Sequence, residues 1–294
     1  MTTAHHRLVR VGPAPVLAVN VAGEGPLVVF LHGIGGNRSN WEHQLGPVGA
    51  EFTAAAWDAR GYGDSEDYPG PLEFADFTSD LVRVMDELDV GRAHLVGVSM
   101  GGRIALDFCA RLPDRVATLV LADTSVGDAK VASPQEVEAF LAIRKRPLLE
   151  GKTPRDIAPD VLASLIGPGT GPDARGRMLE SLAQLHRDSY LKTLDTVTRY
   201  TWFPPFERIG VPTLVMVGEH DRIATPEYAR TVAERIPGAQ LEIIAGGSHI
   251  SNMDRPEEFT RALLEFLRPH ASKADVPGQI RSRPTARLEQ SANR

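Results

Sequence analysis

Apolar residues along the chain gather in short runs that are separated by polar segments. A continuous apolar run of about five residues is typical of a strand buried on both faces of a sheet. The segment 7–21 instead alternates, and it predicts two edge strands separated by Gly12-Pro13. The predicted strands span 8–11, 16–21, 27–31, 53–57, 94–98, 117–122, 211–218 and 240–244.

Segments with helical spacing lie between these strands. Phe77, Leu81, Val84 and Leu88 recur every three or four residues and predict a helix. Further helices are predicted over 102–110, 226–235 and 256–267. Because strands and helices alternate, the pattern predicts an α/β fold with a mostly parallel sheet covered on both sides. Ligands bind at the carboxyl ends of the strands in such sheets.

The pattern changes between residues 126 and 204. This stretch has no strand-like apolar run, and Gly and Pro divide it into several helical segments. It therefore predicts a helical insertion within a core built from 1–125 and 205–269. Residues 270–294 carry little apolar surface and predict a disordered tail.

Composition narrows the classes of partner. The chain has 294 residues and a net charge of −6, which argues against nucleic acid because phosphate binding needs a basic face. The lone Cys109 can form no internal disulfide. The N-terminus has no signal pattern, and no apolar run approaches the roughly 18 residues that span a bilayer. We expect a cytoplasmic protein with no membrane partner. Composition does not indicate whether the chain forms oligomers.

The stretch around Ser99 carries the first candidate chemistry. It reads Gly97-Val98-Ser99-Met100-Gly101, with a predicted strand before it and a predicted helix after it. A serine at such a sharp strand-to-helix turn is typical of a nucleophile elbow. The helix that follows directs its first N–H groups toward developing negative charge.

A serine hydroxyl becomes a good nucleophile only beside a base, and that base needs a third group to orient it. His249 follows the last predicted strand, in Gly-Gly-Ser-His. Asp221 follows the strand before it, in Gly-Glu-His-Asp. Asp123 also ends a predicted strand and is the alternative acid, but Asp221 is preferred. No His, Cys and Asp cluster has the spacing of a metal site, so we predict no metal and no cofactor.

These motifs together resemble the α/β-hydrolase family, in which the serine, the acid and the histidine follow in this order along the chain. The resemblance covers about residues 7–269. It rests also on His32-Gly33-x-Gly35 and on the loop 58–65. It implies an eight-stranded, mostly parallel sheet with a helical cap, which the insertion at 126–204 would form.

The resemblance also implies a reaction class. Relatives that open epoxides or remove halides carry Asp at the elbow, so Ser99 points to acyl chemistry on a small molecule. The oxyanion hole is expected to use the backbone N–H groups of Ile34 and Met100. The segment 248–257 and the elbow are similar to 3-oxoadipate enol-lactonases, although those enzymes often carry Asn-Ser-Leu-Gly where this chain has 32–35.

We therefore predict a serine hydrolase that cleaves a carboxylic ester or lactone through an acyl-enzyme. Cleavage of an amide or an activated C–C bond by the same triad is an alternative, and a non-catalytic ligand receptor on this fold is another. Trp41 and Trp202 are candidates to line the substrate pocket. A dicarboxylate substrate would also need a cation near Ser99. The candidate cations are Arg38, Arg144, Arg146 and Arg199.

Overall fold

The computed structural model describes residues 6–126 and 133–278. Within these residues the strands form one eight-stranded sheet in the order β1-β2-β4-β3-β5-β6-β7-β8. The strands from β4 to β8 in this order are parallel, whereas β2 is antiparallel to both of its neighbours. The strands are β1 (Arg7–Val11), β2 (Leu17–Ala22), β3 (Leu27–Leu31), β4 (Thr53–Trp57), β5 (Ala93–Val98), β6 (Val116–Ala122), β7 (Thr213–Gly218) and β8 (Gln240–Ile244).

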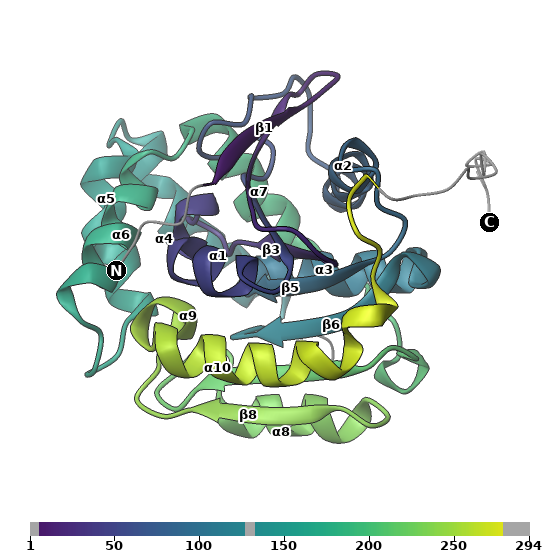
Figure 1. Cartoon of the computed structure of the whole chain (residues 1–294). Helices are drawn as coiled ribbons and strands as arrows, with labels where there is room; N and C mark the ends of the chain where they lie inside the picture. The colour runs from purple at the N-terminus through teal and green to yellow at the C-terminus, as the bar shows by residue number, and fades with distance from the viewer. Residues whose placement is uncertain (1–5, 127–132, 279–294) are drawn as a thin grey trace.

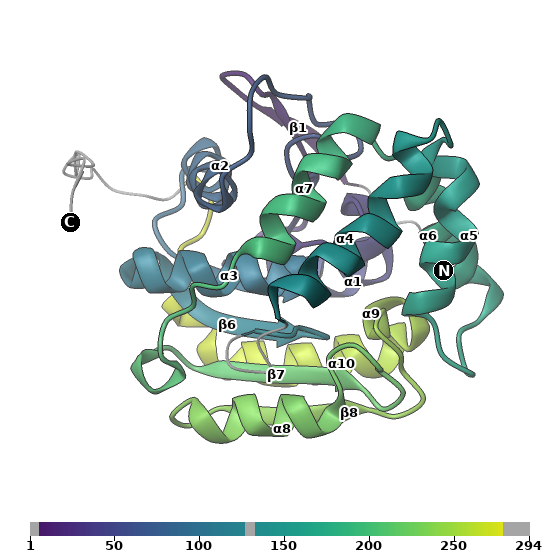
Figure 2. The same ribbon diagram turned by 180° about the vertical axis from the view of Figure 1, so that it is seen from behind.

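Helices cover both faces of the sheet (Figures 1 and 2). Alternate residues of the central strands pack into two separate apolar clusters, as the period of a strand requires. In β3, for example, Val28 and Phe30 face one cluster and Val29 and Leu31 face the other. The first cluster is completed by α1 (Glu42–Gly49) and α10 (Pro256–Leu267), and the second by α2 (Phe74–Glu87), α3 (Met100–Arg111) and α8 (Pro226–Arg235).

The chain between β6 and β7 forms a helical cap at one end of the sheet (Figure 2). Its helices are α4 (Pro134–Leu149), α5 (Pro154–Leu165), α6 (Pro172–Ala183) and α7 (Arg187–Arg199). Three of the prolines that interrupt the sequence pattern here are the first residues of helices, where a missing N–H costs no hydrogen bond. Part of the predicted insertion, 127–132, lies outside the described residues.

Short helices complete the described chain. They are η1 (Arg38–Trp41), η2 (Pro113–Arg115), η3 (Phe206–Arg208), α9 (Ser251–Asp254) and η4 (Arg268–Lys273).

Two predictions need correction. Only β1 is an edge strand of the N-terminal pair, because β2 pairs with β1 on one side and β4 on the other. Residues 270–278 belong to the folded core rather than to a tail. Asp275 accepts hydrogen bonds from the N–H groups of Gly91 and Leu27 at 2.8 and 2.9 Å. The rest of the predicted tail, 279–294, lies outside the described residues.

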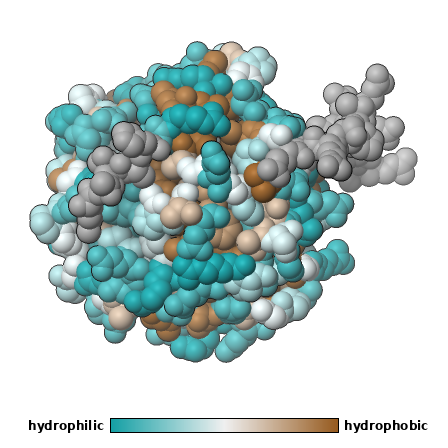
Figure 3. All heavy atoms as spheres, viewed as in Figure 1, coloured by the Kyte–Doolittle hydropathy of each residue, from teal (hydrophilic) through white to brown (hydrophobic). Residues whose placement is uncertain are grey.

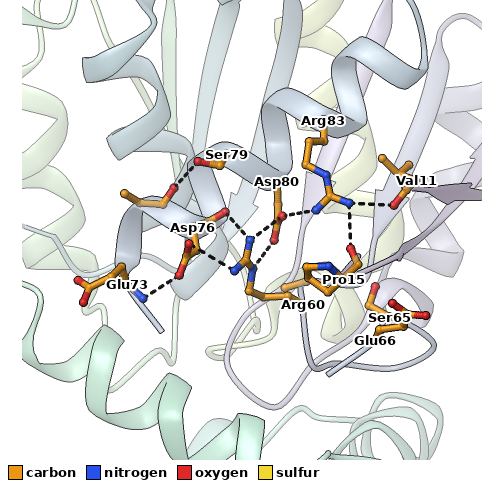
Figure 4. A network of polar contacts seen from close by, with 12 residues as sticks. Val11, Pro15, Arg60, Ser65, Glu66, Glu73, Asp76, Ser79, Asp80 and Arg83 are labelled. Carbon is orange, nitrogen blue, oxygen red and sulfur yellow. Dashed lines mark hydrogen bonds and ion pairs between the residues drawn. The ribbon is translucent and has the colours of Figure 1, made fainter. Parts of the chain in front are cut away.

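A network of charged side chains fastens α2 to the turn between β1 and β2 (Figure 4). The fully buried carboxylate of Asp80 accepts hydrogen bonds from Arg60 and Arg83, with the shortest contact at 2.6 Å. Arg83 also donates to the carbonyl oxygens of Val11 and Pro15 at 3.1 and 2.9 Å. The two arginines thereby compensate the cost of burying the Asp80 charge.

One face of the molecule is seen in full atomic detail in Figure 3. Hydrophilic side chains cover most of the face seen in Figure 3, on which α10 turns its apolar side inward. No helix in the described part of the chain combines the length and the apolar character that crossing a bilayer requires.

Candidate active site

Ser99 lies in the sharp turn between β5 and α3. Its φ of 53° falls in the left-handed region, which is costly for a residue with a side chain and typical of a functional site. Glycines make room for the turn. A Cβ at Gly97 would lie 2.2 Å from the carbonyl carbon of Gly101, and a Cβ at Gly101 would lie 2.0 Å from the oxygen of Leu31. The G-x-S-x-G spacing therefore follows from the close approach of three backbone segments.

The structure brings Ser99, His249 and Asp221 together. Nε2 of His249 lies 3.0 Å from Oγ of Ser99, and Nδ1 lies 2.8 Å from Oδ2 of Asp221. Because a carboxylate only accepts, Nδ1–H donates to Asp221, and the neutral ring then presents the lone pair of Nε2 to the Ser99 hydroxyl. This arrangement can remove a proton from Ser99.

Backbone contacts fix the acid and the base. The second oxygen of Asp221 accepts from the N–H groups of Ile223 and Ala224 at 2.7 and 3.0 Å. The N–H of His249 donates to the carbonyl of Leu165, at the end of α5 in the cap, at 3.2 Å. The histidine is 5% exposed, so its ring lies between the cap and the core with little access to water.

Burial disfavours the charged form of His249. The hydrogen bond to Asp221 and the charges of Asp221 and Asp123 act in the opposite direction, and together they raise the pKa of the imidazole above its ordinary value of 6.5.

The alternative acid, Asp123, contacts other partners. Its fully buried carboxylate accepts from the N–H of Gly218 at 2.9 Å and from the N–H and hydroxyl of Ser251 at 2.9 and 2.7 Å. Burial and the neighbouring charge of Asp221 raise the pKa of Asp123. Asp123 thus joins the end of β7 to the start of α9, and these two positions flank Asp221 and His249.

His32 organises the loop that faces Ser99. Its Nδ1–H donates to the carbonyl of Gly33 at 2.9 Å, and its Nε2 accepts from the N–H of Ala59 at 3.1 Å. Burial lowers the pKa of His32, which agrees with the neutral ring that these contacts require. A Cβ at Gly33 would lie 3.3 Å from Cβ of Ser99, so the loop that carries Ile34 packs directly against the elbow.

This geometry and the sheet order can be compared with known proteins. The profile described as the alpha/beta hydrolase family matches residues 28–262. The chain belongs to the alpha/beta hydrolase family. The resemblance and the fold class expected from the sequence are thereby confirmed.

Similar hydrolases include lactonases and esterases. The 3-oxoadipate enol-lactonase 2 of Acinetobacter baylyi is 27% identical over 259 residues, which cover 86% of this chain and 94% of that protein. The enol-lactonase of Burkholderia xenovorans LB400 superposes with a TM-score of 0.78 at 28% identity, covering 89% and 99% of the two chains. A thermophilic esterase from Thermogutta terrifontis gives 0.81 at 27% identity, covering 91% and 100%.

In this hydrolase a cavity of about 300 Å³ opens at Ser99 between the core and the cap. His32, Ile34 and His249 line it from the core. Its walls are mostly apolar, and five apolar side chains form much of them. These are Trp41, Val161, Met178, Leu194 and Met253.

The predicted pocket residues of this hydrolase divide into two groups. Trp41 and Arg144 line the cavity. Arg38 instead pairs with Asp58 and Asp64 and is not among the lining residues. Trp202 is 50% exposed and lies under the guanidinium of Arg111, 5.1 Å from Cζ to the ring centroid. The predictions that Arg38 and Trp202 line the pocket are therefore wrong, because each side chain is directed to partners elsewhere.

Sequence reasoning missed polar groups in the cavity of this hydrolase. Tyr190 and Ser164 line it from the cap, and Asn40 and Asn252 line it from the core. Tyr190 lies among apolar positions of α7 that look alike in the sequence, so no motif marks it. Among the described residues, no group of three His, Cys, Asp or Glu side chains lies close enough to hold a metal ion.

Proposed function

We propose that this hydrolase cleaves a carboxylic ester or lactone through an acyl-enzyme on Ser99. The observation that carries the proposal is the position of His249, hydrogen-bonded to both Ser99 and Asp221 beside a mostly apolar cavity. Ester and lactone cleavage are favoured over other acyl reactions by the enol-lactonases and the esterase among the relatives. A lactone related to the substrate of the enol-lactonases is the preferred candidate.

In the first half of the reaction, Oγ of Ser99 attacks the carbonyl carbon while Nε2 of His249 takes the hydroxyl proton. The carbonyl oxygen becomes an oxyanion. We assign its stabilisation to the N–H groups of Ile34 and Met100. Met100 begins α3, so its N–H has no partner within the helix.

In the second half, the C–O bond breaks and His249 gives its proton to the leaving oxygen. In a lactone this oxygen remains tethered to the acyl group. Water then attacks the acyl-enzyme, with His249 again as the base, and the free acid leaves. Asp221 holds the ring in one tautomer and stabilises its charged form throughout.

A panel of small esters, lactones, amides and vinylogous diketones tests the proposal. We expect turnover of esters or lactones without added cofactor, and a fluorophosphonate probe should label the peptide that contains Ser99. If only amides or diketones are cleaved, the enzyme is an amide or C–C bond hydrolase and the proposed ester or lactone cleavage is wrong. Failure of the probe to label, together with tight binding of a panel member, would indicate a ligand receptor.

The pH dependence of kcat/KM follows from the state of His249. The base must be neutral, and its pKa is raised, so activity should fall as the pH drops through a midpoint above 6.5. The charge of Asp123 helps to raise the pKa of His249. Because the pKa of Asp123 is itself raised to about 7, only its ionised fraction contributes near the midpoint, so Asp123→Asn should move the midpoint to lower pH by a small amount. The measurement is kcat/KM between pH 5 and 9 for both proteins. A midpoint unchanged or raised in the variant would contradict the expectation.

A further inference from the structure

The cap wall of the catalytic cavity carries a positive charge without a negative partner. Arg144, on α4, lines the cavity and forms no ion pair with any residue in 6–126 or 133–278. The other candidate cations differ: Arg38 pairs with Asp58, Arg146 with Glu150 and Arg199 with Glu138. None of the described residues that line the cavity is acidic.

The guanidinium of Arg144 is held in place from two sides. One Nη2–H donates to Oγ of Ser164 at 2.9 Å, and that hydroxyl donates in turn to the carbonyl of Val161 at 2.6 Å. Cζ lies 5.5 Å from the centroid of the Phe140 ring, one helical turn before it. A guanidinium has five N–H donors, and within the described chain the guanidinium of Arg144 donates to one acceptor, Oγ of Ser164.

A second unsatisfied donor lies near Arg144. Tyr190, on α7, lines the same cavity and is 1% exposed, yet its hydroxyl has no hydrogen-bond partner among the described residues. Burial raises the pKa of Tyr190, and the charge of Arg144 opposes this rise, which places the two groups within electrostatic reach. The helices that carry them lie side by side in the cap (Figure 2).

We infer that Arg144 and Tyr190 form a carboxylate-binding subsite in the cap, so that the preferred substrate is an ester or lactone carrying a second, ionised carboxyl group. This inference rests on the proposed function for the bond that is cleaved. An Arg fork binds a carboxylate through parallel hydrogen bonds, and a phenolic hydroxyl can donate a third. The cavity volume of about 300 Å³ is at the lower end of ligand sites, so the acid must be small.

A matched pair of substrates tests the subsite. Monoethyl glutarate carries the carboxylate, and the ethyl ester in which an isopropyl group replaces that carboxylate is its neutral isostere. The wild-type protein should prefer the anionic ester in kcat/KM. In Arg144→Gln this preference should fall about 30-fold, chiefly through KM, because the charge contact is made equally before and during the reaction. Arg144→Lys should retain part of the preference, since it keeps the charge without the fork.

Two further variants separate binding from structure. Tyr190→Phe should reduce the preference without lowering the melting temperature, because it removes a hydroxyl that has no partner in the described chain. Arg146→Gln, two positions from Arg144 on α4 and paired with Glu150, is the control and should change neither quantity.

The outcomes distinguish the subsite from the hydrolytic activity. Equal or better turnover of the neutral ester by the wild-type protein would overturn the subsite and leave the hydrolase in place. If no ester or lactone is cleaved, the proposed reaction is wrong. The binding of glutarate then tests whether the carboxylate subsite exists. Glutarate should then raise the melting temperature of the wild-type protein and not that of Arg144→Gln, and equal shifts or no shift would overturn the inference.

Discussion

Replacement of Ser99 by alanine is expected to lower kcat on the best ester or lactone by a factor on the order of 10⁶. The reason is that His249 then has no hydroxyl to activate, and no acyl-enzyme can form. Binding and the oxyanion donors survive the change, so slow turnover above the uncatalysed rate should remain. Steady-state kinetics with the substrate found in the panel measures the loss.

Ser79→Ala is a matched control for this experiment. Ser79 is exposed on α2, where its hydroxyl donates to the carbonyl of Ala75 at 3.1 Å, away from the cavity. The Ser79→Ala variant should have the same activity as the wild-type protein. Retention of wild-type turnover by Ser99→Ala would show that another group is the nucleophile.

Replacement of Asp221 by asparagine is expected to lower kcat by about 10⁴-fold. The amide would present a donor to Nδ1 of His249, so the neutral ring would adopt the other tautomer. Nε2 would then carry a proton and could no longer accept one from Ser99. Because the N–H groups of Ile223 and Ala224 can still bind the remaining oxygen, the loop should keep its shape.

Asp123→Asn provides the comparison. This carboxylate contacts Gly218 and Ser251 instead of His249, so its loss should disturb the site less than the loss of Asp221. Melting temperatures of both variants separate misfolding from a defect in chemistry. A larger fall in kcat for Asp123→Asn than for Asp221→Asn, at equal melting temperature, would make Asp123 the acid of the triad.

Local patterns in the sequence predict much of the fold. The helices at 226–235 and 256–267 have the predicted bounds, because a proline marks the first residue of each and an apolar stripe follows. The helix α1 received no prediction, since Gly46, Pro47 and Gly49 interrupt its pattern. Residues 270–278 resemble a tail in composition, and the contacts that hold them on the core, such as those of Asp275 with Leu27 and Gly91, come from segments distant in the sequence.

The candidate site, like the fold, is only partly predictable from the sequence. Ser99, Asp221 and His249 are predictable because each follows a strand that ends at the same edge of the sheet. Arg38 and Arg144 look equivalent in the sequence. In the folded chain Arg38 pairs with two carboxylates, whereas Arg144 lines the cavity and has no carboxylate partner among the described residues. Tyr190 also lines the pocket, and it reaches the cavity because α7 packs over the core.

The hydrogen bonds from Leu27 and Gly91 to Asp275 have a consequence for biosynthesis. Ser99 is translated before Asp221 and His249, and also before Asp275, which fastens the segments at Leu27 and Gly91. A hydroxyl without its base reacts poorly, so in the proposed mechanism the nascent polypeptide carries Ser99 in an unreactive form until residue 249 has been translated and the chain has folded. Incomplete chains released before residue 249 would therefore be harmless to acyl compounds in their surroundings.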